Sequence, residues 1–207
     1  SGDALYINSS CTGVTIKNNT FTRNTASNHG GAVYIAVPYT LDITNCNFTS
    51  NYAKASYPHS DNDGYGGGLF YESSNGKVTD CNFDSNIAER GAGIYINSNI
   101  YQSTNMLVTN CTFTNNIATR KNDNNNAACD GGAIFWSSPD GMVTNSTFIN
   151  NTARCWSGAI DWNSTTDFTM SNSIFINNTA SQGGAILFRQ KVNQISIDHS
   201  SFESNKA

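Results

Sequence analysis

Acidic and basic side chains in the second half of the chain are the residues best suited to acid–base chemistry. Two carboxyl groups can cleave a glycosidic bond, because one protonates the leaving oxygen while the other acts as base or nucleophile. The candidates are Asp130, Asp140 and Asp161, together with Arg154, Arg189 or Lys191. No second carboxylate stands directly above or below Asp161 in the repeat register, and no Ser-His-Asp set or nucleophile elbow occurs. We therefore expect no catalytic residues and no enzyme.

A second group of chemically varied residues lies in an insertion over residues 54–65. Its side chains are candidates for binding a ligand, and they are Tyr57, His59, Asp61, Asp63 and Tyr65. The stretch Asp61-Asn62-Asp63-Gly64 resembles part of a calcium loop, but it lacks the later Glu that completes such a site. A solvated turn is the preferred interpretation and a calcium site at Asp61 and Asp63 the weaker one. We expect no other metal and no cofactor.

All of these residues are positioned by a repeat in which Phe is followed three residues later by Asn and five residues later by Ala. The seven copies begin at Phe21, Phe48, Phe83, Phe113, Phe148, Phe175 and Phe202. Their Asn residues are Asn24, Asn51, Asn86, Asn116, Asn151, Asn178 and Asn205. A phrase that recurs every 27 to 35 residues is typical of a stacked repeat protein.

Each repeat predicts three short strands. The first follows a Gly-x-Ala phrase such as Gly131 to Ile134, the second carries alternating apolar residues such as Met106 and Val108, and the third surrounds the Phe. Strands this short cannot bury a core alone, so the units must stack on one another. Parallel crossover connections are right-handed in nearly all cases. The sequence therefore predicts an all-β fold, a right-handed single-stranded parallel β-helix (solenoid) of about seven coils.

The repeated columns also predict packing roles. The Phe column predicts a buried aromatic ladder, and the Ala column predicts a corner where the next strand approaches closely. The Asn column predicts a ladder in which each side-chain amide bonds its own backbone and the Asn of the neighbouring coil. Another polar column, three residues before each Phe and running from Asn18 to His199, predicts a second turn ladder. These residues are structural because packing needs them in every coil, whereas a catalytic site does not.

The first strand of each repeat predicts an outward row of aromatic residues. An aliphatic residue such as Ile134 faces the core, so its successor faces outward. This row, the outer aromatic strip, consists of Tyr6, Tyr34, Phe70, Tyr95 and Phe135 and is interrupted by Asp161. An exposed strip of this kind is typical of a surface that binds sugars or a partner protein. Alternatively, the rings stabilise the sheet or are covered by a flanking domain. Reversed parity would instead expose Trp136 and Trp162.

The six cysteines fall into three groups. Cys46, Cys81 and Cys111 share one column of small residues, which predicts buried thiols, because a zinc site needs four convergent donors. Cys129 and Cys155 occupy equivalent positions on neighbouring coils. Vertical neighbours about 5 Å apart fit disulfide geometry, so we expect a Cys129–Cys155 bridge and an extracellular setting. Cys11 has no evident partner.

Composition argues against several classes of function. The net charge of −4 argues against a nucleic-acid partner, which requires a basic stripe. Apolar runs fall short of the roughly 20 residues needed to cross a bilayer, so we expect no membrane insertion by this segment. The sequence begins and ends in phase with the repeat. We therefore expect residues 1–207 to be a single β-helix repeat domain, a slice of a longer secreted surface protein.

The paired phrases resemble those of known surface proteins. Gly131-Gly132-Ala133-Ile134 and Phe148-Ile149-Asn150-Asn151 are similar to the repeats of the chlamydial polymorphic outer-membrane adhesins and of the adhesin-like β-helix proteins of methanogenic archaea. The resemblance covers the whole chain, with departures such as Ser157 in place of the first Gly. It implies an extracellular module at the cell surface that attaches to a glycan or protein of another cell.

Two functions are compatible with these features. The first is a non-catalytic cell-surface adhesin module that binds a surface glycan or protein of a partner cell. The second is a polysaccharide-processing lyase or hydrolase, or a tailspike-like β-helix, because many parallel β-helices cleave acidic polysaccharides with clustered carboxylates, often with calcium. Binding without turnover distinguishes the first from the second.

Overall fold

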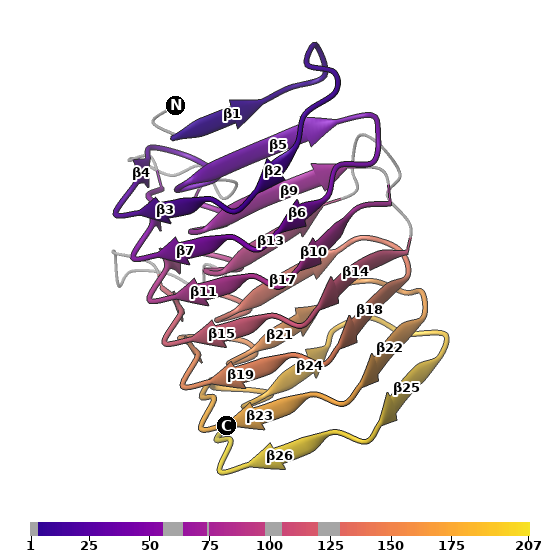
Figure 1. Ribbon diagram of the computed structural model, residues 1–207. Helices are drawn as coiled ribbons and strands as arrows, with labels where there is room; N and C mark the ends of the chain where they lie inside the picture. Colours follow the sequence, from indigo (N-terminus) through magenta and orange to yellow (C-terminus); the bar gives the residue numbers. More distant parts are fainter. Residues whose placement is uncertain (1–3, 56–63, 74, 98–104, 120–128) are drawn as a thin grey trace.

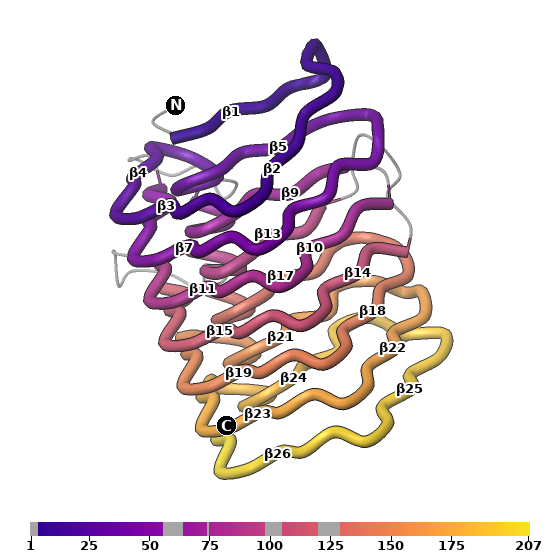
Figure 2. Tube along the Cα trace, viewed as in Figure 1, coloured from indigo at the N-terminus to yellow at the C-terminus, as the bar shows by residue number. Residues whose placement is uncertain are grey.

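The chain forms a stack of coils built from short β-strands, as seen in a computed structural model (Figure 1). The structure describes residues 4–55, 64–73, 75–97, 105–119 and 129–207, and its regular elements within these ranges are all strands. Strands β1 (Leu5–Ile7) and β26 (Ser201–Glu203) lie at opposite ends of the stack. The Cα trace in Figure 2 follows one coil after another along the axis. The predicted all-β solenoid of about seven coils is confirmed.

Four parallel sheets, A to D, run along the stack. Sheet A consists of β1, β5 (Val33–Val37), β9 (Leu69–Ser73), β13 (Ile94–Asn97), β17 (Ile134–Ser137), β21 (Ile160–Trp162) and β24 (Ile186–Phe188). Sheet B consists of β2 (Ile16–Lys17), β6 (Ile43–Thr44), β10 (Lys77–Thr79), β14 (Met106–Thr109), β18 (Gly141–Thr144), β22 (Phe168–Ser171) and β25 (Ile195–Asp198).

The other two sheets complete each coil. Sheet C consists of β3 (Thr20–Thr22), β7 (Asn47–Thr49), β11 (Asn82–Asp84), β15 (Thr112–Thr114), β19 (Thr147–Ile149), β23 (Ile174–Ile176) and β26. Sheet D consists of β4 (Thr25–Ala26), β8 (Tyr52–Ala53), β12 (Ile87–Ala88), β16 (Ile117–Ala118) and β20 (Thr152–Ala153). Equivalent residues of successive coils are register partners, for example Phe83 with Phe113.

Sheet D corrects the prediction of three strands per repeat. The predicted corner after the ladder Asn is itself a two-residue strand, and its Ala points inward, with Ala88 and Ala118 fully buried. Parallel bridges from Thr152 to Thr179 and from Thr179 to Lys206 continue this pairing into the last coils. The sequence did not reveal this strand because two residues are too few to show the period-two alternation of apolar and polar side chains.

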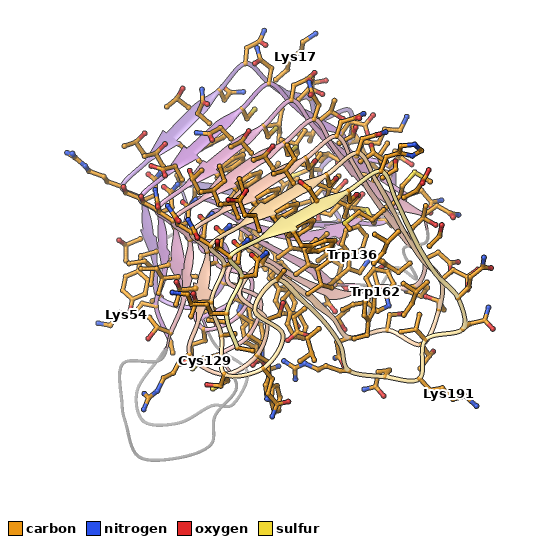
Figure 3. All side chains as sticks on the ribbon, turned by 90° about the horizontal axis from the view of Figure 1, so that it is seen from below. Lys17, Lys54, Cys129, Trp136, Trp162 and Lys191 are labelled. Carbon is orange, nitrogen blue, oxygen red and sulfur yellow. The ribbon has the colours of Figure 1, made fainter. Side chains whose placement is uncertain are left out.

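The core lies inside the coils, and the predicted parity of sheet A is confirmed. Trp136 and Trp162 are fully buried, and Figure 3 shows both in the interior, whereas Lys17, Lys54 and Lys191 point away from the stack. Reversed parity, which would expose the two Trp rings, is therefore wrong. The regular alternation of inward and outward residues follows from the pleat of a strand.

Two glycines in sheet B and its entrance make room for the largest core side chains. A Cβ on Gly141 would overlap the ring of Trp136, and a Cβ on Gly76 would overlap the phenol of Tyr71. Both rings are fully buried and have no space into which to move. At both positions glycine replaces an apolar side chain of the sheet B column. A bulky side chain from sheet A of the same coil fills the space that is left.

The Phe column forms the predicted ladder, which is fully buried from Phe48 to Phe175, whereas Phe21 is half-buried and Phe202 is 48% exposed at the two ends of the stack. Successive rings are stacked with centroids 4.6 to 5.0 Å apart from Phe21 to Phe202. The ring planes of Phe113 and Phe148 are parallel, at an interplanar angle of 0°. The ladder therefore packs the interior at the spacing that the parallel strands impose.

The Asn column forms a ladder along the Asn-x-Ala corner, with one correction to its hydrogen bonding. Nδ2 of Asn116 donates to Oδ1 of Asn151 (2.9 Å) and to the carbonyl of Phe83 on the preceding coil (2.9 Å). Oδ1 of Asn116 accepts from both the backbone N–H and Nδ2 of Asn86. The amide thus bonds the backbone of neighbouring coils rather than its own backbone. Each buried Asn in this column ties three coils together.

The polar column before each Phe is a turn column, as expected. Its members, from Asn18 to His199, all adopt positive φ, with values such as 54° at Asn110. Asn, Asp and His tolerate this left-handed conformation better than most residues. Side-chain bonds join Asn45 to Asn18 and Asn110 to Asp80, so the second ladder exists at these positions.

Ser157 shows how the fold accommodates a departure from the Gly-Gly phrase. The first Gly of the phrase has positive φ, as at Gly131 (64°), and Ser157 keeps the same conformation at 54°. Its buried hydroxyl lies 2.6 Å from the carbonyl oxygen of Ile160 and 2.9 Å from that of Ala185. These polar contacts offset the strain of a side chain at positive φ.

Candidate functional site

The outer aromatic strip faces outward as predicted, but its predicted exposure is wrong for most of its length. Phe70, Tyr95 and Phe135 are 5%, 7% and 1% exposed, and Asp161 is fully buried. Tyr34 is half-buried, and only Tyr6 at the end of the stack is broadly exposed, at 53%. Neighbouring rings of the strip stack 4.7 to 5.3 Å apart. The strip therefore acts mainly as a packed layer on the outside of sheet A.

A second column of residues covers the strip. This covering column consists of the residues just before each Gly-Gly phrase: His29, Tyr65, Arg90, Asp130, Trp156 and Gln182. Parallel bridges join its members from Tyr65 to Gln182. Tyr65 stacks on Tyr95 at 4.6 Å, and His29 stacks on Phe70 at 5.1 Å. Tyr65 and Asp130, the last residues of the two long insertions, belong to this column, whereas residues 56–63 and 120–128 lie outside the described ranges.

A buried charge cluster lies where the strip is interrupted by Asp161. Nε of Arg189 donates to both carboxylate oxygens of Asp161 at 2.8 and 2.9 Å, and its Nη2 lies 2.5 Å from Oδ2. The same Nη2 is 2.5 Å from Oδ2 of Asp130, and Nε of Arg90 lies 3.2 Å from that same oxygen. The two Oδ2 atoms are thus no farther apart than twice 2.5 Å. This is a carboxylate pair that the sequence-based expectation lacked.

Burial and the arginines oppose one another in setting the charge of this cluster. Burial raises the pKa of Asp161 to about 7, against the opposing effect of its hydrogen bonds with Arg189. Burial likewise raises the pKa of Asp130 above its usual value, while Arg189 and Arg90 oppose the rise. Desolvation disfavours a charged carboxylate, and a nearby guanidinium favours it.

Aromatic rings enclose the cluster from outside. The guanidinium of Arg189 lies 4.0 Å from the ring centre of Trp156 and 5.4 Å from that of Phe135. Both carboxylates have no exposed surface, whereas the Arg189 and Arg90 side chains are 16% and 25% exposed. A solute therefore meets arginine and tryptophan first, and it reaches the carboxylates only if these side chains move. In the geometry described, the cluster links four successive coils, those of β13, β17, β21 and β24.

The predicted disulfide is absent. Neither Cys129 nor Cys155 forms a disulfide. They do lie on neighbouring coils, with the backbone N–H of Cys155 donating to the carbonyl of Cys129 at 3.2 Å. The thiols of Cys46, Cys81 and Cys111 are buried, as predicted, and each donates to the carbonyl of the Thr two residues earlier at 3.2 to 3.3 Å. Cys11 also forms no disulfide and is half-buried.

The remaining predicted site residues cannot be placed in the same way. Tyr57, His59, Asp61 and Asp63 lie outside the described residues, and so does the weaker calcium site. Among the residues that are described, no group of three or more His, Cys, Asp or Glu side chains could hold a metal ion. Within the same residues, no helix is long and apolar enough to cross a membrane.

An open groove of about 440 Å³ runs along the outer face of sheet B. It is lined by Lys77, Asn105, Leu107, Asp140, Gly141, Met142, Asp167 and Thr169. These residues belong to four successive coils, because Lys77, Leu107, Met142 and Thr169 are register partners on β10, β14, β18 and β22. The sheet B groove therefore runs parallel to the axis of the stack, along the row of strands that faces the viewer at the right of Figure 1.

Three parallel rows of different chemistry form this face. The first holds the acids and amides of the turn that enters sheet B: Asn105, Asp140 and Asp167. The second is the largely apolar floor of Leu107 and Met142, with Met142 42% exposed. The third is a hydroxyl row of register partners: Thr79, Thr109, Thr144 and Ser171. Thr144 donates to Thr109 at 2.8 Å within this row.

The carboxylates of the groove keep hydrogen-bonding capacity. Oδ1 of Asp140 accepts from the backbone N–H of Asp167 at 3.3 Å, and Oδ1 of Asp167 accepts from Nδ2 of Asn193 at 2.7 Å. Both side chains are half-buried, and neither forms an ion pair with any residue of the described ranges. Of the groove residues, only Asp140 was a sequence-based candidate. The available signal was the pair of apolar residues at outward positions of sheet B, Leu107 and Met142.

The fold agrees with the comparison to known families. The sequence matches the family described as the right handed beta helix region over residues 1–120 and 59–207, two overlapping stretches that span the whole chain. The chain therefore belongs to the right-handed β-helix family. No curated protein and no solved structure matches it. Such a domain fits a surface protein or a polysaccharide-related protein.

Proposed function

We propose that the chain is a non-catalytic attachment module of the cell surface that binds a glycan of a partner cell through the sheet B groove. The supporting observation is the groove itself, in which the apolar side chains of Leu107 and Met142 lie beside a row of carboxylates and amides, with the hydroxyl row on the other side of the same face. A sugar ring has the complementary form, with an apolar C–H face and hydroxyl groups around its edge. Hydrogen-bonding side chains that flank an apolar surface are typical of small-molecule binding sites.

The covered state of the outer aromatic strip favours the groove over the strip as the contact surface. Phe70, Tyr95 and Phe135 are stacked beneath the covering column and have little surface to offer a ligand. Met142 and Thr169 are accessible at the floor of the groove. Tyr6 is the one member of the strip with broad exposure, and it lies at the N-terminal end of the stack.

A polysaccharide-processing enzyme is the second candidate, and the charge cluster favours it. Asp130 and Asp161 meet at one nitrogen of Arg189, and a carboxyl group with a raised pKa suits general acid catalysis. Movement of Trp156 and Arg189 would have to open this cluster before a substrate could contact it. The attachment function needs no such movement, and we therefore place it first.

One pair of assays on the same protein separates the two functions. A glycan array and pull-down on candidate partner cells measures binding, and a reducing-end assay on the bound polysaccharides measures cleavage. Attachment predicts binding with no release of reducing ends. Release of oligosaccharides that is abolished in Asp161→Asn would overturn the proposal and support the enzyme, whereas the absence of both binding and release would overturn both functions.

A further inference from the structure

We propose that the sheet B groove selects linear glycans that carry free amino groups, a refinement that rests on the proposed attachment function. The ligand is a polymer of amino sugars lying parallel to the axis of the stack. Its amines meet Asp140 and Asp167, while its sugar rings lie on Leu107 and Met142.

The shape of the groove indicates a linear ligand. Its lining residues come from β10, β14, β18 and β22, and Lys77, Leu107, Met142 and Thr169 follow one another in register. Successive coils thus present side chains at a constant spacing along the axis, set by the spacing of parallel strands. A chain of repeating sugars can contact several coils at once, whereas a single sugar fills only part of the groove.

The charge of the groove indicates a basic group on that ligand. Asp140 and Asp167 are adjacent along the axis, because they immediately precede the register partners Gly141 and Phe168. Each carboxylate uses one oxygen in the hydrogen bonds described above and leaves the other available. Two like charges on neighbouring coils repel one another, and a cation between them relieves that repulsion. An acidic polysaccharide would place further negative charge at the same point.

The coordination chemistry favours an ammonium group over a metal ion. Calcium takes six to eight oxygen ligands, and magnesium demands a nearly ideal octahedron. The described residues contain no group of three or more His, Cys, Asp or Glu side chains close enough to hold a metal. An ammonium group needs only a few acceptors, which the carboxylates of Asp140 and Asp167 can supply. The apolar floor of Leu107 and Met142 then has a use, because it contacts the carbon skeleton of the sugar.

Lys77 places the basic group within the groove. It lies on β10, at the opposite end from Asp167 on the entrance to β22. Its ammonium group repels an amine at that end, so the ligand amines are directed towards Asp140 and Asp167. A neutral or N-acetylated sugar is acceptable beside Lys77. The groove is thus acidic at the end of Asp140 and Asp167 and basic at the end of Lys77. A ligand that carries charges of one sign along its whole length does not match both ends.

The test compares glycans that differ only in their amino groups. Wild-type protein is titrated by calorimetry with a glucosamine hexamer, with its N-acetylated counterpart and with a galacturonate hexamer, at low and at high salt. We expect the amine-bearing hexamer to bind about tenfold more tightly than the N-acetylated one, since hydrogen bonds between charged groups are stronger than those between neutral groups. We also expect this preference to shrink at high salt, because exposed charges are screened.

A double variant locates the preference. Asp140→Asn with Asp167→Asn retains the hydrogen-bond acceptors and suits the positive φ of residue 140 (41°). It should lose the preference for the amine while keeping the affinity for the N-acetylated hexamer. The matched control, Asp84→Asn with Glu203→Gln, removes the same charge from sheet C and should keep the preference.

The outcomes separate this inference from the proposed function. Tighter binding of the N-acetylated or the acidic hexamer, or an unchanged preference in the groove double variant, overturns the inference and leaves attachment through a glycan in place. Loss of the preference in the sheet C control also overturns it, because net charge then explains the result. Failure of every hexamer, together with failure of all glycans on the array, overturns both.

Discussion

At the scale of single residues, the two carboxylate pairs have opposite surroundings. Asp130 and Asp161 are fully buried and share Arg189, whereas Asp140 and Asp167 are half-buried beside an open groove. The first pair is held by ionic contacts that link neighbouring coils. The second pair has acceptor oxygens that a ligand can reach. Burial therefore favours a structural role for the first pair, and the accessibility of the second pair makes it the candidate for ligand binding under the proposed function.

The raised pKa of Asp161 predicts a pH dependence of stability. Between about pH 4 and about pH 7 the folded chain retains a proton on Asp161 that the unfolded chain has released. The stability that this proton contributes is present at acidic pH and is lost as the pH rises through about 7. The urea midpoint of the wild type, measured relative to that of Asp161→Asn, should therefore decrease as the pH rises from about 4 to about 7. Parallel midpoints of the two proteins across this range would contradict the prediction.

At the scale of single elements, each coil is stabilised by contacts with the equivalent positions of its neighbouring coils and by packing between its own sheets. The Phe and Asn ladders join equivalent positions of neighbouring coils, and the glycines of sheet B face the bulky rings of sheet A. The ladder contacts link each coil to its neighbours, and each glycine makes room for a large ring of the same coil. A substitution should consequently cost more in the middle of the stack than at its ends.

The Asn ladder gives the first test of this expectation. Asn116→Ala removes bonds to Asn86, Phe83 and Asn151 and leaves buried polar groups unpaired, so it should cost roughly 3 kcal/mol of stability. The control Asn24→Ala, at the N-terminal end of the ladder, removes one side-chain bond to Asn51 and should cost roughly 1 kcal/mol. Urea unfolding of both variants measures the difference. Equal losses would show that the position in the ladder does not matter.

The pairing of glycine with a bulky ring gives the second test. Gly141→Ala places a methyl group against the buried rings of Trp136 and Trp162, and overpacking of this kind costs about 1–3 kcal/mol. Adding Trp136→Phe makes room for the methyl group. The double variant should therefore lose less stability, by thermal melting, than the sum of the two single variants. Additive losses would contradict a direct clash.

At the scale of the whole molecule, the repeats explain why the fold could be predicted. Phe113, Asn116 and Ala118 recur in register in all seven copies, so their burial and stacking follow from the sequence alone. The proximity of Asp130 and Asp161, both of them sequence-based candidates, escaped prediction because the two residues belong to different columns on neighbouring coils, which a comparison of equivalent positions does not bring together. The cover over Phe135 was missed because it comes from residues that differ in every coil.

The groove was missed for a related reason. Its apolar floor at Leu107 and Met142 occupies an outward column that holds Lys77 and Thr169 in the neighbouring coils. Unlike the stacked outer aromatic strip of sheet A, this outward column of sheet B holds a different residue in each of these four coils, so no repeat pattern marks it. Such variation allows a surface of the solenoid to acquire a binding site without disturbing the core.

The central claim is that the sheet B groove is the contact surface for a glycan. Met142 and Ile174 are both 42% exposed, but Met142 lies in the groove and Ile174 lies on the outer face of sheet C. The most direct measurement compares glycan binding, on an array and by calorimetry, for the wild type, Met142→Lys and Ile174→Lys. The groove predicts that Met142→Lys abolishes binding while Ile174→Lys binds like the wild type. If Met142→Lys binds as well as the wild type, the claim is contradicted, whether or not Ile174→Lys loses binding.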